Sequence, residues 1–222
     1  MLVLLPPSEG KTPARRGKPL DLATLSFPEL TSTCERVLEP LVDLEGSDPE
    51  ALRTALGLSV RQDDEIARDA ALLTAPTATA GRVYSGVLYD ALDLGSLDAP
   101  AKRRAQRSIV VASALFGALR LGDRIPAYRL SGDSVLPGLG GLPAVWRDPL
   151  ATAMTAAAGR GLVVDLRSGA YAALWKPTGD VASRTVAVRV LQELPDGSRA
   201  VVSHFNKATK GRLVRDWMLT GA

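Results

Sequence analysis

The sequence predicts an α/β or α+β fold: a single compact domain with a central mixed sheet flanked by helices. Two kinds of run indicate it. Short apolar runs bounded by turn residues, such as residues 2–5, predict buried strands, and longer runs with apolar residues at helical spacing, such as residues 28–44, predict helices. Near the end, the Pro-Asp-Gly-Ser turn of residues 195–198 separates two segments, residues 185–194 and 199–205, and is the clearest hairpin signal.

Caps and breakers place the other elements. Residues 109–112 predict a β-branched buried strand, and residues 162–166 predict another. Asn206 is able to cap a basic C-terminal helix that runs through Met218. Helices are further predicted at residues 48–57, which Asp48 and Pro49 begin and Gly57 ends, at the basic residues 102–107, and at residues 146–158, which Gly159 and Gly161 end.

Residues 48–73 predict a helical hairpin, because Ser59 is able to cap a second helix through residues 66–73. The connection Leu-Gly-Leu-Ser at residues 56–59 resembles the loop of a helix-hairpin-helix, whose amides bind a nucleic-acid phosphate. Ser59 stands where that loop has its second glycine, so an ordinary αα-hairpin is the favoured interpretation.

Composition bounds the class of protein. The chain has 222 residues, of which 46% are hydrophobic and 23% charged, and residues 1–222 are expected to form one soluble globular domain. The start lacks the basic and apolar regions of a signal peptide, and the longest mostly apolar run, residues 108–119, is too short to span a bilayer. We therefore expect a cytoplasmic protein.

Cysteine and histidine are too scarce for familiar metal and hydrolase sites. Cys34 and His204 are the only residues of their kinds, which excludes an intrachain disulfide and every Cys/His zinc pattern, so a metal site would need carboxylates. We expect neither a metal nor an organic cofactor, since no Gly-x-Gly-x-x-Gly follows a predicted strand. Gly-Asp-Ser at residues 132–134 resembles a serine-hydrolase box, but a nucleophile elbow is absent, and His204 at a strand end suits a structural role.

The net charge of +3 suits an anionic partner without demanding one. Basic residues gather in three clusters, each of which is also compatible with a solvated helix face or loop. The clusters are Arg15, Arg16 and Lys18; Lys102, Arg103, Arg104 and Arg107; and Lys207, Lys210, Arg212 and Arg215.

The segment LLPPSEGKT, residues 4–12, ends in the Gly-Lys-Thr of a P-loop but lacks the rest of that motif. Leu5 occupies the position of the glycine that opens a phosphate-binding loop, and Pro6 and Pro7 have no N–H to donate. A strand that runs into a polar loop is therefore the favoured interpretation, and we expect Lys11 to be a cation held at the end of that strand.

The segment SALFGALRLGDRIPAYRLSGD, residues 113–133, predicts a polar, broken region that leaves a buried strand and is not core. Loops at strand ends are common places for binding sites. Arg120 and Arg129 are able to clamp an anion with two N–H groups each, and Tyr128 offers a hydroxyl or a stacking face. A structural loop tied together by neighbouring ion pairs is an equal alternative.

A second candidate is VVDLRSGAYAALWKP, residues 163–177. Here a predicted strand opens into Ser168 and a helical turn that carries Tyr171 and Lys176. Free amides after Ser168 are able to bind a phosphate or a carboxylate. A plain connection between elements explains the same pattern equally well.

Five segments together resemble the YaaA family, the peroxide stress resistance proteins. The resemblance implies a compact α/β domain with a helix-hairpin-helix-like element and a positively charged cleft, DNA binding, and a role in limiting oxidative DNA damage when iron and peroxide are present. It implies no established catalytic reaction. The segments are MLVLLPPSEGKT at residues 1–12, VYSGVLYDAL at 83–92, SALFGALRLGDRIPAYRL at 113–130, VVDLRSGAYAALWKP at 163–177 and VVSHFNKATKGRLVRDWM at 201–218.

Residue by residue, the resemblance implies nucleic-acid contacts from the family's opening loop, its central block, its Lys-Pro block and its last basic block. We expect the loops that carry these contacts to converge on one side of the sheet as a single cleft for an anionic ligand. The residues are Lys11, Arg120, Arg129, Lys176, Lys207, Lys210 and Arg212.

Two functions stay open. The first is a cytoplasmic DNA-binding protein of the peroxide stress response that holds duplex or branched DNA by its phosphates, because aromatic residues, 5% of the chain, are too sparse for stacking on single strands. The second is an enzyme of unknown reaction on a small phosphorylated or carboxylated substrate, with Tyr128, Ser168 and Lys176 near the chemistry. A purely structural partner protein would need an exposed apolar patch, which the sequence does not indicate.

Overall fold

The computed structural model describes residues 1–43, 49–59, 63–194, 197–201 and 206–221, and a five-stranded sheet lies at its centre. Strands β3, β1, β8 and β9 are parallel, and β4 is antiparallel to β3. The predicted mixed sheet within an α/β domain is therefore confirmed. In spatial order the strands are β4 (Gly117–Arg120), β3 (Ile109–Ser113), β1 (Leu2–Leu5), β8 (Val163–Asp165) and β9 (Thr185–Ala187).

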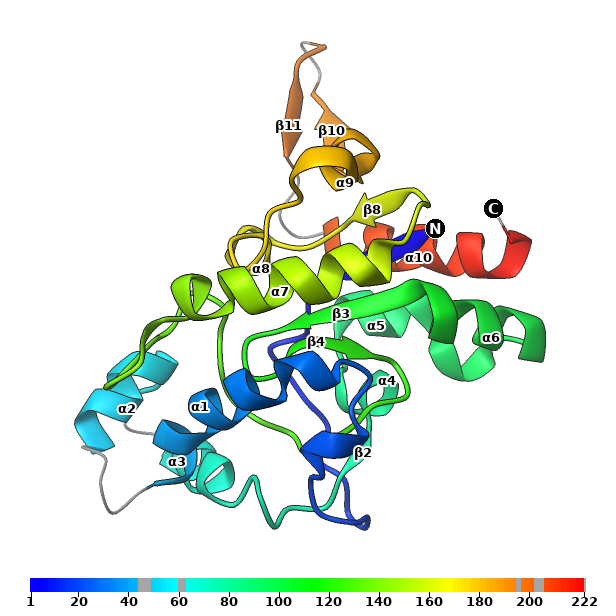
Figure 1. Cartoon of the computed structure of the whole chain (residues 1–222). Helices are drawn as coiled ribbons and strands as arrows, with labels where there is room; N and C mark the ends of the chain where they lie inside the picture. Colours follow the sequence, from blue (N-terminus) through cyan, green and yellow to red (C-terminus); the bar gives the residue numbers. More distant parts are fainter. Residues whose placement is uncertain (44–48, 60–62, 195–196, 202–205, 222) are drawn as a thin grey trace.

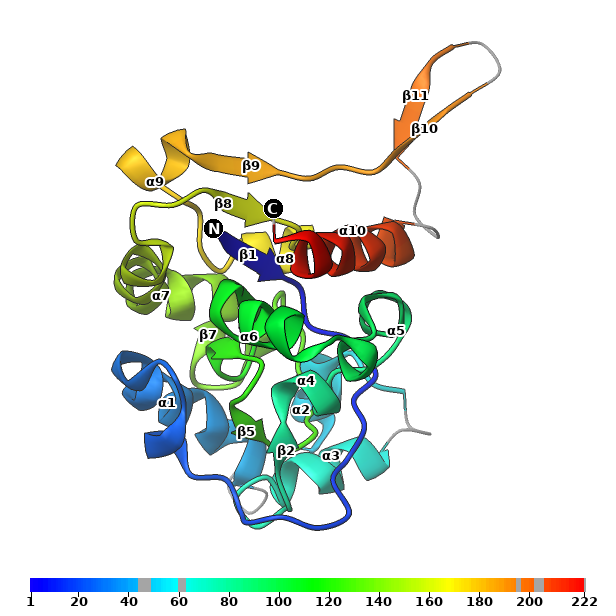
Figure 2. The same cartoon turned by 90° about the vertical axis from the view of Figure 1, so that its right-hand side faces the viewer.

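Helices cover both faces of the inner strands, which explains the sequence of those strands. Every residue of β1 and β3 is buried, and parallel strands with both faces covered are continuous apolar runs instead of alternating ones. Figure 2 shows α7 (Leu142–Ala158) on one side of the sheet and α5 (Val87–Leu92) and α10 (Asn206–Thr220) on the other.

The remaining elements surround this sheet (Figure 1). Three small two-stranded ladders pair β2 with β5, β6 with β7, and β10 with β11, and the last of these projects away from the body of the molecule. The helices are α1 (Thr31–Val42), α2 (Pro49–Leu56), α3 (Asp63–Ala70), α4 (Ala80–Val83), α6 (Ala99–Ser108), α8 (Gly169–Ala172) and α9 (Gly179–Ser183), and the short strands are β2 (Ala78–Thr79), β5 (Arg124–Ile125), β6 (Val135–Leu136), β7 (Gly140–Gly141), β10 (Leu191–Glu193) and β11 (Arg199–Val201).

The turn between β3 and β4 packs directly against α7. Gly117 has φ +69°, and a Cβ atom there would lie 2.6 Å from Cζ3 of Trp146. The Trp146 indole is fully buried, and its N–H donates to the carbonyl of Ala114 at 2.8 Å. Only glycine combines this backbone conformation with this close approach, so Gly117 fixes how the hairpin meets the helix.

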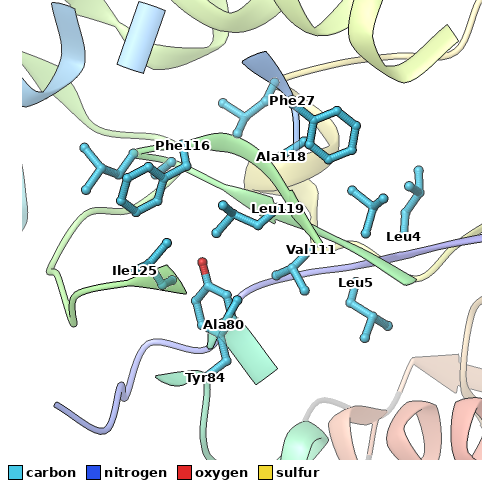
Figure 3. Close-up of a cluster of buried hydrophobic side chains, with 14 of the residues drawn as sticks. Leu4, Leu5, Phe27, Ala80, Tyr84, Val111, Phe116, Ala118, Leu119 and Ile125 are labelled. Carbon is cyan, nitrogen blue, oxygen red and sulfur yellow. The ribbon is translucent and has the colours of Figure 1, made fainter. Parts of the chain in front are cut away.

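Apolar side chains from several elements fill the space beside the sheet (Figure 3). Leu4 and Leu5 of β1 and Val111 of β3 lie in one buried cluster with Tyr84, which follows α4, and Ile125 of β5. Tyr84 is the polar member of this group. Its hydroxyl must find a partner inside the protein, because an unpaired buried hydroxyl is costly.

The connectivity identifies one edge of the sheet as the place for a site. The chain passes from β1 to β3 on one side of β1 and later reaches β8 on its other side. In open parallel sheets, ligands bind outside the carboxyl ends of the strands, where the strand order changes direction. Here that is the edge at which β1, β3 and β8 end, called the carboxyl edge below.

Most predicted elements are confirmed with shifted ends. The strand predicted at residues 185–194 is divided, because β8 ends at Asp165 and β9 therefore has no partner strand beyond residue 187, after which β10 pairs with β11. That pairing confirms the hairpin, although residues 195–196 of its turn lie outside the described residues. The helix predicted through residue 73 ends at Ala70.

The expectation that residues 113–133 are too polar for the core is wrong. Residues 114–119 are buried as the β3–β4 turn and β4 itself, and Tyr128 is 2% exposed. Gly117, one of the glycines that indicated a loop, permits a tight turn between two core strands, and the buried Asp123 accepts from a backbone and a side-chain donor. Its carboxylate accepts from the Arg120 amide at 2.7 Å and from the Ser26 hydroxyl at 2.6 Å.

Candidate functional site

The loop after β1 folds back onto the segment that follows α4. The Tyr89 hydroxyl donates to the Pro6 carbonyl at 2.8 Å, and the Ser85 amide donates to the Ser8 hydroxyl at 3.0 Å. Lys11 then forms an isolated antiparallel bridge with Tyr84. A P-loop lysine opens a helix, whereas Lys11 is held in extended backbone beside the carboxyl edge.

The Lys11 amine lies over aromatic rings and is held by carbonyl groups. Its Nζ donates to the carbonyls of Ser8 at 3.0 Å and Glu9 at 3.4 Å, and it lies 4.2 Å from the centre of the Tyr128 ring. In the part of the chain that the structure describes, no carboxylate lies within 4.0 Å of it. Burial, followed by the charge of Arg129, lowers the pKa of Lys11 to about 8, against the opposing effects of Asp69, Glu65 and Glu9.

A chain of hydroxyl groups runs beneath this amine. The Tyr128 hydroxyl lies 2.9 Å from that of Tyr84 and 2.8 Å from that of Ser113, and the Ser113 hydroxyl accepts from the Phe116 amide at 2.9 Å. Burial raises the pKa of Tyr84 and Tyr128 well above the usual value. These phenols therefore stay protonated and act as hydrogen-bond partners.

Asp69, in the last turn of α3, is the buried acid of the site. It is 1% exposed; one carboxylate oxygen accepts from the Arg129 amide at 2.8 Å, and the other has no hydrogen-bond partner among the described residues. Burial raises the pKa of Asp69 to about 7, and the Arg129 amide and the Lys11 charge oppose the shift. Asp69 is thus able to take or release a proton near neutral pH.

We call this group the Lys11 cluster. A strongly perturbed lysine beside a strongly perturbed aspartate is typical of functional sites. Sequence reasoning identified Lys11, Tyr128 and Arg129 but missed the others, which only the folding of distant segments brings there. The members are Lys11, Asp69, Tyr84, Ser113, Tyr128 and Arg129.

The remaining tyrosines border the cluster. The rings of Tyr84 and Tyr89 are stacked with centres 5.6 Å apart. Tyr171, in α8, is close enough for its charge to raise the pKa of Tyr84, Tyr89 and Tyr128. The carboxyl edge therefore holds all four tyrosines of the chain.

A second group of polar side chains lies at the carboxyl end of β8. The Arg167 guanidinium holds Asp165 with two hydrogen bonds, of 2.7 and 2.9 Å, and lies 5.3 Å from the Trp175 ring. The Lys210 ammonium donates to the Leu166 carbonyl at 2.9 Å, and burial lowers the pKa of Lys210. Lys210 thus anchors α10 to the carboxyl edge instead of offering a free cation.

Arg120 lies away from the Lys11 cluster. The antiparallel register pairs Gly117 with Ser113 and Arg120 with Val110, so Arg120 stands near the amino end of β3. Its guanidinium donates to the Arg107 carbonyl at 2.7 Å and borders a hollow of about 500 Å³. The expectation that all seven basic residues meet on one side is therefore wrong for Arg120, because β4 reverses the chain direction.

The other candidates are on the surface. Lys176, Lys207 and Arg212 are exposed, and Lys207 and Arg212 belong to the same helix, α10, that Lys210 anchors. Ser168 is exposed and precedes α8, and its carbonyl accepts from the Ala172 amide at 2.8 Å. Of the three residues considered for catalysis, Tyr128 alone belongs to the Lys11 cluster. His204 lies outside the described residues.

The two helices of the predicted helical hairpin are present as α2 and α3. The amides of Gly57 and Leu58 donate to the carbonyls of Thr54 and Arg53, so these two groups are used within the end of α2. Residues 60–62 lie outside the described residues, and a phosphate-binding hairpin stays a prediction.

Together these features define an α/β protein with a buried, protonatable site and cationic groups at the carboxyl edge of its sheet. The chain belongs to the family described as peroxide stress protein YaaA, whose model matches residues 1–221. It is 58% identical to a UPF0246 protein of Streptomyces coelicolor over 100% of this chain and 84% of that protein. It is also 46% identical to a UPF0246 protein of Corynebacterium efficiens over 97% of this chain and 84% of that protein.

The described residues hold neither a membrane-spanning helix nor a metal-binding group of side chains. None of the helices there is both long and apolar enough to cross a bilayer. In the same residues, no three or more His, Cys, Asp or Glu side chains are grouped so as to hold a metal ion.

Proposed function

We propose that this protein is a cytoplasmic DNA-binding protein of the peroxide stress response, which holds duplex or branched DNA by its phosphates and limits iron-dependent oxidative damage. One observation carries the proposal. Lys11 and Arg129 come from segments far apart in the sequence, yet they lie close enough for the charge of Arg129 to lower the pKa of Lys11, and neither has an ion-pair partner among the described residues. Two such cations held together favour an anion between them.

A helix anchored at the same edge of the sheet carries further exposed cations that suit a long polyanion. Lys210 fixes α10 to the end of β8, and Lys207 and Arg212 on that helix are exposed. Tyr84, Tyr89 and Tyr128 are buried and so cannot stack on unpaired bases, which favours backbone contacts over single-strand recognition. Phosphate contacts carry little sequence information, so unrelated duplexes should bind alike.

The salt dependence of duplex binding tests the proposal. Log affinity should fall linearly with log salt, and Lys207→Ala/Arg212→Ala should reduce that slope by about 1 for each lost phosphate contact. Arg103→Ala/Arg160→Ala removes the same charge from exposed positions in the segments that lead into β3 and β8 and is the matched control. An affinity that does not change between low and physiological salt would reject DNA binding, and equal losses in both double variants would reject this surface.

A second candidate function is an enzyme that acts on a small phosphorylated or carboxylated substrate. The lowered pKa of Lys11 and the raised pKa of Asp69 favour it, because such pairs are typical of sites that move protons. If Arg129→Ala abolished binding of one small anion and left duplex affinity intact, the enzyme would be the better interpretation.

A further inference from the structure

We propose that Lys11 is a nucleophilic amine that forms a Schiff base with the aldehyde of an abasic deoxyribose in DNA. This inference rests on the proposed DNA binding and adds a reacting group to it. Three structural observations support it: how the amine is held, which groups are able to move its protons, and which cations surround it.

Backbone carbonyls orient the Lys11 amine, and no carboxylate in the described part of the chain pairs with it. The carbonyls of Ser8 and Glu9 accept two of its N–H groups, and no carboxylate among the described residues is within ion-pair distance. A neutral amine has two N–H groups and one lone pair. With both N–H groups donated to carbonyls, the lone pair remains available for attack on a carbon atom.

The surroundings also favour the neutral amine. Lys11 has a pKa of about 8 compared with 10.5 for an ordinary lysine, chiefly because of burial and then because of Arg129. Asp69, Glu65 and Glu9 are the acidic groups that act on it in the opposite direction. Desolvation beside another cation is a known way to activate a lysine for carbonyl chemistry.

Groups that are able to transfer the required protons lie beside the amine. Nζ adds to the aldehyde carbon, and the carbonyl oxygen takes up a proton to give a carbinolamine; loss of water then leaves the imine. Amine and aldehyde thus give imine and water without any oxidant or reductant. Asp69, with one carboxylate oxygen that has no hydrogen-bond partner among the described residues and a pKa of about 7, is able to receive and return the proton. The Tyr128 ring, whose centre lies 4.2 Å from Nζ, borders the amine.

An abasic site fits the surroundings better than a free aldehyde does. Its sugar carries a phosphate on each side, which suits the Arg129 charge next to the Lys11 amine, and it has no base to accommodate among buried tyrosines. A nucleotide without a paired base also costs least to turn out of a duplex toward a part-buried group.

Reductive trapping tests the inference. The full chain is incubated with a duplex that carries one abasic site, in the presence of cyanoborohydride, which reduces an imine to a stable amine. We expect a covalent protein–DNA adduct whose peptide map places the link on Lys11. Because the neutral fraction of an amine with a pKa near 8 rises about fivefold between pH 7 and pH 8, the initial yield should rise by about that factor.

Matched controls separate this chemistry from general binding. A duplex with a tetrahydrofuran analogue lacks the aldehyde and should give no adduct. Lys11→Arg keeps the charge but is not a nucleophile and should lose the adduct, whereas Lys102→Arg at an exposed lysine of α6 should keep it. If Lys11→Arg does not fold, the peptide map of the unaltered protein still decides.

The outcomes distinguish the two proposals. Salt-dependent binding of the intact duplex without an adduct, or with adducts spread over surface lysines, overturns the role of Lys11 and leaves DNA binding standing. Absence of salt-dependent binding to any duplex removes the function on which this inference rests.

Discussion

At the scale of single residues, two opposite pKa shifts define the site. Burial raises the pKa of Asp69 to about 7 and lowers that of Lys11 to about 8, so each group loses charge more easily than in water. The fold keeps both groups in place, because the Arg129 amide donates to the Asp69 carboxylate and the backbone of Lys11 is held by its bridge to Tyr84. Each shift has a consequence for stability.

Asp69→Asn should stabilise the protein above neutral pH. The folded-state pKa of Asp69 is raised, so the contribution of its carboxyl group to stability is fully present below the unfolded pKa near 3.8. That contribution is lost as pH rises through the folded pKa of about 7. Asparagine carries no charge at any pH. We expect the free energy of unfolding in urea to rise by about 1–3 kcal/mol at pH 8 and to change little at pH 4.

Lys11 has the opposite sign, because its folded pKa is lowered. Its contribution to stability is present above the unfolded value of 10.5 and is lost as pH falls to about 8, which is above the pH range in which Asp69 acts. A gain from Asp69→Asn that was equal at pH 4 and pH 8 would contradict a charged, buried Asp69.

Members of the Lys11 cluster could be predicted only where the local sequence indicates a site. Lys11 was predictable from a strand that runs into a polar loop, and Tyr128 and Arg129 from a glycine-rich segment. Asp69 and Ser113 were not, because an aspartate in a helix and a serine at a strand end are ordinary features. Their neighbours are fixed by contacts across 60 and 15 positions of the chain.

At the scale of elements, the β3–β4 turn determines which charges meet. Gly117 reverses the chain beneath Trp146, and the antiparallel β4 then carries Arg120 toward the amino end of β3. Long elements with clear periodicity, such as α7 and α10, could be predicted from the sequence. The short β4 could not, because its glycine and the aspartate after it are also typical of loops.

Gly117→Ala should destabilise the domain. The added methyl group meets a strained backbone conformation and the Trp146 ring at once, so we expect a loss of about 2–4 kcal/mol in urea unfolding. Gly122→Ala is the control, since a Cβ there meets nothing within 4 Å and its φ is not in the left-handed region. Similar losses for the two variants would show that the Trp146 contact does not matter.

At the scale of the whole molecule, the sheet separates two kinds of basic residue. Lys11 and Arg129 lie at the carboxyl edge with their charges unpaired among the described residues, whereas Arg120 at the other end of β3 holds a backbone carbonyl. The sequence presented Arg120 and Arg129 as equals, because the spacing between them does not reveal that the chain reverses.

Arg120→Ala and Arg129→Ala should therefore differ. Arg120→Ala should lower the free energy of unfolding by about 1 kcal/mol through a lost hydrogen bond and leave duplex affinity unchanged. Arg129→Ala should reduce duplex affinity and should reduce the slope of log affinity against log salt by about 1. The melting temperature should be nearly unchanged, because the backbone amide of residue 129 still donates to the Asp69 carboxylate. The reverse pattern in calorimetry and binding titrations would move the DNA surface to the amino end of the sheet.

The four tyrosines give the site an optical signal of its own. Since the chain has only Tyr84, Tyr89, Tyr128 and Tyr171, and all four lie at the carboxyl edge, every tyrosine band in an ultraviolet resonance Raman spectrum originates there. The hydroxyl chain through Tyr128 makes those bands sensitive to which phenol donates and which accepts. A ligand that reaches Lys11 thus changes the tyrosine spectrum without any label, and one that binds elsewhere leaves it as it was.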